Sequence, residues 1–335
     1  MIRLTPGRLA AAGGALLAVV ALVLWLTPSD SYIFLPDRAH PVSPLVRVQG
    51  GKEPREGGVY YVDVFVRRAS WFERLFPGLR EGASVVPASA VQPPGVSESA
   101  RQKEDLREMA RSQEIAAAVA LRALGYKVAA RPIGVLVDQV VVGAPAAGRL
   151  QPTDVVLSVD GKPVRTPAEL RAAIGRRPPR SLVRLGVRRG RSVVQVRLRT
   201  VADPQDRKRP VIGVFVDQAA DVRLPISVKI DAGNVGGPSA GLAFALDVME
   251  ELGRDVDRGR RIAATGEVGL DGSVRPIGGV RQKTIGVRKA GIHVFLVPAG
   301  DNAAEARRYA DGVRIVPVSN FQQALRALAT LPRMQ

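Results

Sequence analysis

The chain has 335 residues, 46% of them hydrophobic but only 4% aromatic, and it carries a formal net charge of +18. This length allows two or three domains with cores of aliphatic side chains. Because the chain has no cysteine, disulfides, cysteine nucleophiles and thiolate metal sites are excluded. No nucleic-acid-binding motif accompanies the basic charge, so we expect a solvated arginine-rich surface and no nucleic-acid partner.

The N-terminus contains an uncharged apolar stretch of 18 residues, from Leu9 to Leu26. As a helix it would be about 27 Å long, close to the thickness of a bilayer's hydrocarbon core. Arg3 and Arg8 precede it, which favours an N-terminus inside the cell. We therefore expect residues 1–30 to be a single-pass anchor in the cell membrane, with the bulk of the chain extracytoplasmic. A cleaved signal peptide or a buried core helix are the alternatives.

Residues 31–125 are expected to form a membrane-proximal region. The segment Val59–Val66 alternates as a strand does, and residues 93–99 form a cluster of helix-breaking residues. A helix is expected from Ser99 to about Leu124, ended by Gly125. No chemistry is evident here, which indicates a role in packing or spacing.

Residues 126–200 read as a compact β-rich unit. Long β-branched runs occupy 134–142, 182–187 and 193–198, and Asp160-Gly161 is a hairpin signal. Thr166 and Glu169 form a capping box that opens a helix ending at about Ile174. The stretch from Ala144 to Val164 (APAAGRLQPTDVVLSVDGKPV) resembles a bacterial PDZ domain, here assigned to residues 126–203.

PDZ domains bind extended peptides by adding a strand to a sheet edge. The resemblance implies that the receiving edge lies near Ile133, Gly134, Val135 and Leu136. The alternative is a PDZ domain that docks on its neighbour and binds no free peptide.

The last domain, residues 204–335, follows a polar linker at 201–209 and mixes strands with helices. Strands are expected at 211–216, 226–230, 293–297 and 314–318. Helices are expected at 238–252, 280–290, 302–310 and 320–329, the last of them opened by a capping box of Ser319 and Gln322. The predicted fold class is therefore multidomain α+β: an N-terminal transmembrane helix, a PDZ-like β-rich domain and a C-terminal α/β domain.

Ser239 lies in the first turn of the helix predicted at 238–252, which is apolar on almost every side. Free backbone N–H groups and the positive end of the helix dipole can stabilise an oxyanion there. Glycines on either side allow a substrate backbone to approach closely. The alternative is a serine that only caps the helix.

Lys283 is the one cation on the inward face of the helix predicted at 280–290. A desolvated lysine has a lowered pKa, and its neutral amine can take a proton from a serine hydroxyl. Thr265 could orient that amine by a hydrogen bond. The alternatives are a lysine that extends to solvent along its aliphatic stem and an ordinary threonine at a strand end.

Three motifs carry a second resemblance: Gly237-Pro238-Ser239-Ala240-Gly241, Thr265-Gly266-Glu267, and Pro276-Ile277-Gly278-Gly279 followed by Lys283. Together they resemble the proteolytic domain of Lon proteases over about 211–330. The resemblance implies that Ser239 is the nucleophile, Lys283 the general base and Thr265, Gly237 and Pro238 supporting residues. Classical ATP-driven members often have Asp where this chain has Gly236.

The whole layout resembles the bacterial membrane-anchored, PDZ-containing Lon-like proteases, and by that resemblance six copies could form a ring. The sequence contains no Walker A loop and no His-Glu-x-x-His motif, so neither ATP nor a zinc ion or other cofactor is expected. His293, which a Ser-His-Asp triad would need, is more simply a strand residue.

We therefore expect an ATP-independent serine endopeptidase that cleaves extended or unfolded polypeptides at the membrane, with the PDZ domain serving substrate capture or regulation. One alternative is a proteolytically inert, PDZ-based peptide-binding scaffold. Another is a scaffold that binds anionic lipid through residues 131–200, which carry 14 Lys and Arg against 4 Asp and Glu.

Overall fold

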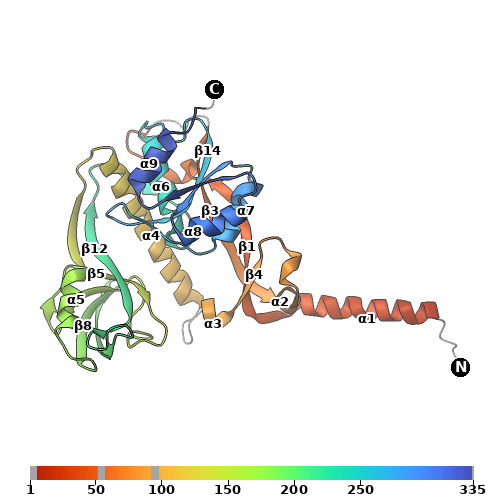
Figure 1. The fold of residues 1–335 in the computed structure, drawn as a ribbon, viewed down its shortest axis with the longest axis horizontal. Coiled ribbons are helices and arrows are strands. Elements are labelled where there is room, and N and C mark those ends of the chain that lie inside the picture. The colour runs from red at the N-terminus through yellow and green to blue at the C-terminus, as the bar shows by residue number, and fades with distance from the viewer. Residues whose placement is uncertain (1–5, 52–56, 92–97, 334–335) are drawn as a thin grey trace.

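A computed structural model of the chain describes residues 6–51, 57–91 and 98–333. Arg3 and the breaker residues 93–97 lie outside the described residues. The chain forms a large domain, a small β-rich domain and an N-terminal helix, α1 (Pro6–Leu26), which projects away from both (Figure 1). In the part of the chain that the structure describes, none of the helices has the length and apolar character that crossing a bilayer requires.

The large domain is built on a six-stranded sheet in the order β18-β17-β14-β3-β1-β4. The strands from β18 to β3 are parallel, whereas β1 pairs antiparallel with both β3 and β4. The bounds of these strands are β1 (Pro28–Pro41), β3 (Gly58–Ser70), β4 (Ser84–Pro87), β14 (Arg261–Ala264), β17 (Val294–Pro298) and β18 (Arg314–Val318).

Two layers of helices cover this sheet because its buried strands alternate between two apolar cores. Ile262 and Ala264 of β14 join one core, and Ala263 between them joins the other. The first core is shared with α4 (Glu98–Ala123), α6 (Gly241–Glu251) and α9 (Phe321–Ala329). The second is shared with α7 (Val280–Lys289) and α8 (Asp301–Arg308).

The expected boundary between residues 31–125 and the last domain is therefore wrong. β1 and β3 belong to the same sheet as β14, and α4 packs against α6. The physical reason is that β3 pairs in parallel with β14, some 200 positions later in the chain, a contact that no local pattern reveals. The N-terminal region completes the core of the large domain.

The small domain is a sheet in the order β12-β5-β6-β8-β9, with β7 paired to β6 and α5 packed against it. Its strands and helix are β5 (Ala129–Val140), β6 (Val155–Val159), β7 (Lys162–Pro163), α5 (Pro167–Gly175), β8 (Leu182–Arg189), β9 (Ser192–Arg199) and β12 (Val214–Arg223). β12 follows the predicted linker, so this sheet ends inside the region that the sequence had assigned to the last domain. Figure 1 shows β5 and β12 running together from the small domain alongside α4.

Short elements complete the chain. They are η1 (Ser43–Leu45), β2 (Val46–Val48), α2 (Trp71–Leu75), η2 (Pro77–Leu79), α3 (Ala88–Val91), β10 (Val201–Ala202), β11 (Pro210–Val211), β13 (Val228–Ile230), η3 (Pro238–Ala240), β15 (Glu267–Val268) and β16 (Val274–Arg275). Thr166 caps α5 as predicted. The cap of α9 lies one residue later than predicted, at Asn320, whose side chain accepts a hydrogen bond from the backbone of Gln323.

Candidate active site

Ser239 lies in η3, a single tight turn that runs directly into the buried helix α6. Gly237 precedes this turn with φ of 83°, a conformation that favours glycine. Two contacts from α4 hold the turn: the Gly237 amide donates to the carbonyl of Asp105 at 3.0 Å, and the Ser112 hydroxyl donates to the carbonyl of Pro238 at 3.0 Å. The region 31–125, in which the sequence showed no chemistry, therefore supports the candidate nucleophile through α4.

The same helix explains the glycine at position 236. A Cβ atom built on Gly236 would lie 2.7 Å from the Cβ of Asp105, closer than packed carbon atoms approach. Any larger side chain at this position would collide with α4. Asp105 itself lies in the cleft beside this turn.

Lys283 reaches Ser239 from α7, which begins after Gly279 in a left-handed conformation. Its Nζ donates to the Ser239 Oγ at 2.6 Å and to the Thr265 Oγ1 at 3.1 Å. The Thr265 hydroxyl in turn donates to the backbone carbonyl of Ser239 at 3.0 Å. The structure thus brings together the three side chains that the sequence singled out, in one closed hydrogen-bonded circuit.

Burial controls the protonation of this lysine. Lys283 is 3% exposed. Burial lowers its pKa to about 8, because loss of solvent destabilises the charged ammonium form relative to the neutral amine. The carboxylate of Asp63 acts in the opposite direction and raises that pKa. With a pKa near 8, roughly a tenth of the molecules carry a neutral amine at pH 7.

Asp63 is a residue that the sequence reasoning missed. It comes from β3 and lines the cleft together with Ser239 and Lys283. Its pKa is raised mainly by burial and further by the neighbouring Asp37, while His40 lowers it. The sequence signal for this residue is a lone carboxylate inside the otherwise apolar run 59–66. A charged side chain at such a position indicates a strand that faces a polar site and not only the apolar core.

Ser239 and Lys283, the catalytic dyad proposed from the sequence, lie in a cleft of about 820 Å³ that both domains line. The large domain contributes residues of η3 and α4 to its lining, and the small domain contributes Leu136 to Gln139 of β5 and Thr153. Carboxyl groups are frequent along it: Asp63, Asp105, Glu108, Asp138 and Glu267. Burial, followed by the neighbouring carboxylates, raises the pKa of Glu108 to about 8.

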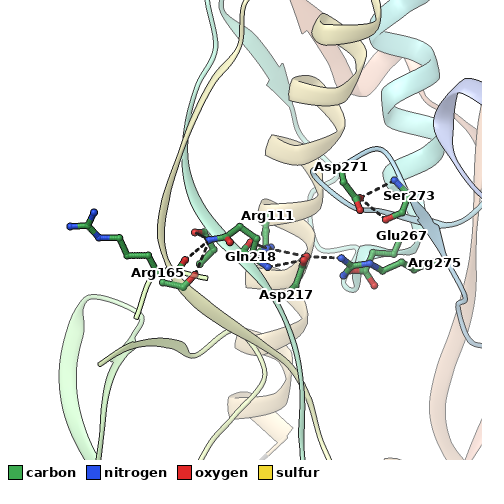
Figure 2. A network of polar contacts seen from close by, with 10 residues as sticks. Arg111, Arg165, Asp217, Gln218, Glu267, Asp271, Ser273 and Arg275 are labelled. Carbon is green, nitrogen blue, oxygen red and sulfur yellow. Dashed lines mark hydrogen bonds and ion pairs between the residues drawn. The ribbon is translucent and has the colours of Figure 1, made fainter. Parts of the chain in front are cut away.

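A polar network ties the small domain to the segment between Thr265 and Lys283 (Figure 2). Asp217 of β12 accepts from Arg275 of β16 at 2.7 Å and lies 3.6 Å from Arg111 of α4. Arg275 also pairs with Glu267 at 3.4 Å, and the Arg111 guanidinium donates to the carbonyl of Gln218 at 3.0 Å. β12 is therefore fixed to the same hairpin that follows Thr265.

The predicted peptide-receiving edge at Ile133, Gly134, Val135 and Leu136 is not free at its last two residues. All four lie in β5, which pairs with β12 along its length and also with β6 at Val135 and Leu136. Val135 pairs with Gln218 of β12 and with Val156 of β6, and Leu136 pairs with Asp217 and Val155. An occupied edge cannot accept another strand. The outer strand on this side of the sheet is β12, which the sequence had placed in the other domain.

Two further groups of side chains among the described residues have spacing compatible with a metal ion. Asp37, His40 and Asp63 form the first, with His40 Nε2 lying 3.6 Å from Asp37 and 3.9 Å from Asp63. Glu250, Asp255 and Asp257 form the second, where Glu250 and Asp257 accept hydrogen bonds from backbone amides and so hold a turn.

His293 takes no part in the cleft. It is exposed, directly before β17, and does not line the cleft that contains Ser239. A Ser-His-Asp triad through His293 therefore has no geometric support.

The comparisons with known proteins agree with this geometry. Residues 213–330 match the family described as the Lon protease (S16) C-terminal proteolytic domain, and residues 108–200 match the PDZ domain family. The Lon protease of Chloroflexus aggregans is 38% identical over 100 residues, covering 28% of this chain and 12% of that protein. Lon protease 2 of Bacillus subtilis is 30% identical over 116 residues, covering 35% and 20%.

The chain therefore spans at most about a fifth of the length of these two curated relatives. Among solved structures, the PDZ domain of an SdrC-like protein from Listeria monocytogenes covers 25% of this chain and 87% of that chain, at 25% identity and a TM-score of 0.24. The sequence matches and the Ser239–Lys283 geometry agree: this chain carries a Lon-type (S16) proteolytic domain together with a PDZ domain.

Proposed function

We propose that this chain is a serine endopeptidase in which Ser239 is the nucleophile and Lys283 the general base. The observation that carries the proposal is the 2.6 Å hydrogen bond between a buried amine and a serine hydroxyl at the head of a helix. A hydroxyl is a weak nucleophile until an adjacent base accepts its proton. A lysine whose pKa lies near 8 is a base of suitable strength close to neutral pH.

The reaction is acyl transfer in two steps. The neutral amine of Lys283 accepts the proton of the Ser239 hydroxyl as the oxygen attacks a peptide carbonyl, and the ammonium then gives a proton to the leaving amine. In the second step the same amine removes a proton from water, whose oxygen attacks the acyl carbonyl, and the ammonium then returns that proton to the Ser239 oxygen as the ester bond breaks. The N-terminal turn that carries Ser239 would favour the negative charge on the carbonyl oxygen.

Thr265 and α4 are supporting elements in this mechanism. Thr265 holds the amine on one side and the Ser239 carbonyl on the other, which limits movement of both catalytic groups. Asp105 and Ser112 hold the turn from behind. Such contacts act by keeping the reacting atoms within bonding reach.

We propose an extended polypeptide as the substrate and no requirement for ATP. The 335 residues contain no Walker A loop, and the cleft between the domains is open and far larger than one side chain needs. Fluorescein-labelled casein, which lacks a stable fold, tests this directly. We expect cleavage at the same rate with and without ATP; no cleavage under either condition would contradict the proposal.

The pH dependence of this cleavage should follow the lysine. Because the active form has a neutral amine, kcat/KM should rise about tenfold per pH unit at low pH and level off above about pH 8. The Asp63→Asn variant removes a charge that raises the pKa of Lys283, so its curve should move towards lower pH. An unchanged midpoint in Asp63→Asn, measured as kcat/KM from pH 5 to 10, would contradict that coupling.

We propose that the PDZ domain captures substrate along the outer edge of β12, beyond the point at which Arg111 contacts the Gln218 carbonyl. This strand is the last on its side of the sheet, and the Asp217–Arg275 pair connects it to the hairpin of β15 and β16. A peptide added along β12 would follow the usual manner of strand addition. An excess of non-cleavable peptide should then slow casein cleavage competitively.

We also propose that α1 attaches the chain to the cell membrane, with the catalytic domain outside the cytoplasm, and that six copies form a ring. Support for attachment comes from the exposed apolar side chains of α1, among them Leu16, Leu17 and Leu22. Light scattering of the detergent-solubilised chain would give the number of copies.

A further inference from the structure

Residues 71–80, which we call the collar, form a rigid apolar projection beside the end of α1. They comprise α2, η2 and the arginine that follows. The amide of Trp71 donates to the carbonyl of Thr27, and the Trp25 and Phe72 rings lie 5.5 Å apart. The collar is thus continuous with the last turn of α1, and Figure 1 shows α2 at the base of that helix.

The collar presents large apolar side chains to solvent. Trp71 is 38% exposed, Leu75 56%, Phe76 51% and Leu79 70%. Single exposed apolar residues are ordinary on a protein surface, but four within nine positions concentrate apolar surface in one short segment, which is typical of interaction sites.

A buried glutamate fixes this projection in shape. Glu73 completes a capping box with Ser70 and accepts two hydrogen bonds from Arg67, at 2.6 and 2.9 Å. Arg80 adds a third charge contact at 3.6 Å from the far end of the collar. These contacts fix the backbone that carries the exposed apolar side chains.

The chemistry of the patch matches the boundary between lipid headgroups and acyl chains. Arg74 lies over the Trp71 ring, 4.9 Å from its centroid, and Arg80 lies over the Trp25 ring at 5.4 Å. Tryptophans combined with arginines, next to a helix with exposed apolar side chains, are typical of segments at a membrane interface. The guanidinium groups can also donate to the phosphate groups of lipid headgroups.

We propose that the collar is a membrane-docking surface, which inserts Trp71, Leu75, Phe76 and Leu79 into the headgroup boundary of a bilayer containing anionic lipid. It holds the large domain against the membrane, so that the cleft stands at a fixed height above the lipid. This inference rests on the proposed attachment through α1 and extends it to a second, independent contact.

The chain offers its own probe, because Trp25 and Trp71 are its two tryptophans. The full chain with Trp25→Phe reports on the collar, and the full chain with Trp71→Phe reports on α1. Each is reconstituted into vesicles of phosphatidylcholine and phosphatidylglycerol, with the phosphatidylcholine brominated either near the headgroup or near the chain end. We expect Trp71 emission to fall about twofold, more with bromine near the headgroup than near the chain end.

Two controls make the result specific. In a chain with Trp25→Phe, Trp71→Phe and Val193→Trp, the new tryptophan stands on an exposed position of β9, and its emission should not change. In the Trp25→Phe chain, adding Leu75→Asp and Leu79→Asp should abolish the quenching of Trp71. The same two aspartates in the Trp71→Phe chain should leave the quenching of Trp25 intact.

The outcomes separate the two claims. Quenching of Trp25 without quenching of Trp71 would overturn the collar while leaving attachment through α1 standing. Loss of quenching at both tryptophans would overturn both. If Trp71 is not quenched, and Leu75→Asp with Leu79→Asp instead reduces the number of copies in light scattering, the collar is a contact between copies and the inference is wrong.

Discussion

Ser239→Ala and Lys283→Ala should each lower kcat/KM for casein by at least about a thousandfold. The first removes the atom that attacks the substrate, and the second leaves the hydroxyl without its proton acceptor. Groups that act as one unit are not additive, so the double variant should be hardly worse than either single one. The measurement is hydrolysis of fluorescein-labelled casein at pH 8 under matched enzyme concentration.

Lys283→Arg is the informative companion to these variants. Arginine keeps the positive charge and the hydrogen-bonding capacity, but its guanidinium does not lose a proton in this pH range. If Lys283 only held the serine in place, Lys283→Arg would retain much of the activity. We expect it to be as inactive as Lys283→Ala.

His293→Ala serves as the matched control, because His293 is exposed and does not line the cleft. Its kcat/KM should stay close to that of the unmodified chain. Activity retained in Lys283→Ala, with a circular dichroism spectrum like that of the unmodified chain, would contradict the assigned base.

The catalytic dyad could be predicted because its signals are local. Glycines around Ser239 and a single inward cation at Lys283 are visible within a few residues of sequence, and each has a physical reason at that place. The helices that carry them also begin close to the predicted positions, since glycine and proline mark both starts.

The surroundings of the dyad could not be predicted because they depend on distant pairing. β14 has only four residues, two of them alanines, so it carries little strand signal although it is central in its sheet. β3 and β1 reach that sheet from the N-terminal region, and Asp63 comes with them.

The edge of the PDZ sheet was misplaced for the same reason. A β-branched run such as residues 134–142 predicts a strand but cannot say whether that strand is central or outermost. β12 takes the outer place from beyond the predicted linker. Its alternation is weak because two polar residues interrupt it: Asp217 pairs with Arg275 of the other domain, and the Gln218 side chain donates to the carbonyl of Gly134 in the neighbouring strand.

Gly286→Ala should be the most damaging small substitution outside the dyad. A Cβ atom at this position in α7 would lie 2.0 Å from the carbonyl oxygen of Asp37 and 3.2 Å from a methyl group of Val62. The first contact is with backbone of β1, which cannot rotate out of the way. The added methyl group favours a helix by up to about 1 kcal/mol, but overpacking costs about 3 kcal/mol and therefore wins.

This substitution should lower activity as well as stability, because α7 carries Lys283 one turn earlier than Gly286. Relief of the clash moves α7 away from β1, and a shift of about 1 Å at the amine would cost about a hundredfold in rate. The measurements are urea unfolding followed by tryptophan fluorescence and kcat/KM for casein.

Gly175→Ala is the matched control for Gly286→Ala, since a Cβ atom at Gly175 in α5 would have no neighbour within 4 Å. It should change the free energy of unfolding by less than about 1 kcal/mol and leave casein cleavage unaltered. A Gly286→Ala chain that matched Gly175→Ala in both measurements would mean that α7 can move off β1 without displacing the amine. In that case the position of Lys283 would depend on its bonds to Ser239 and Thr265 more than on the packing of its helix.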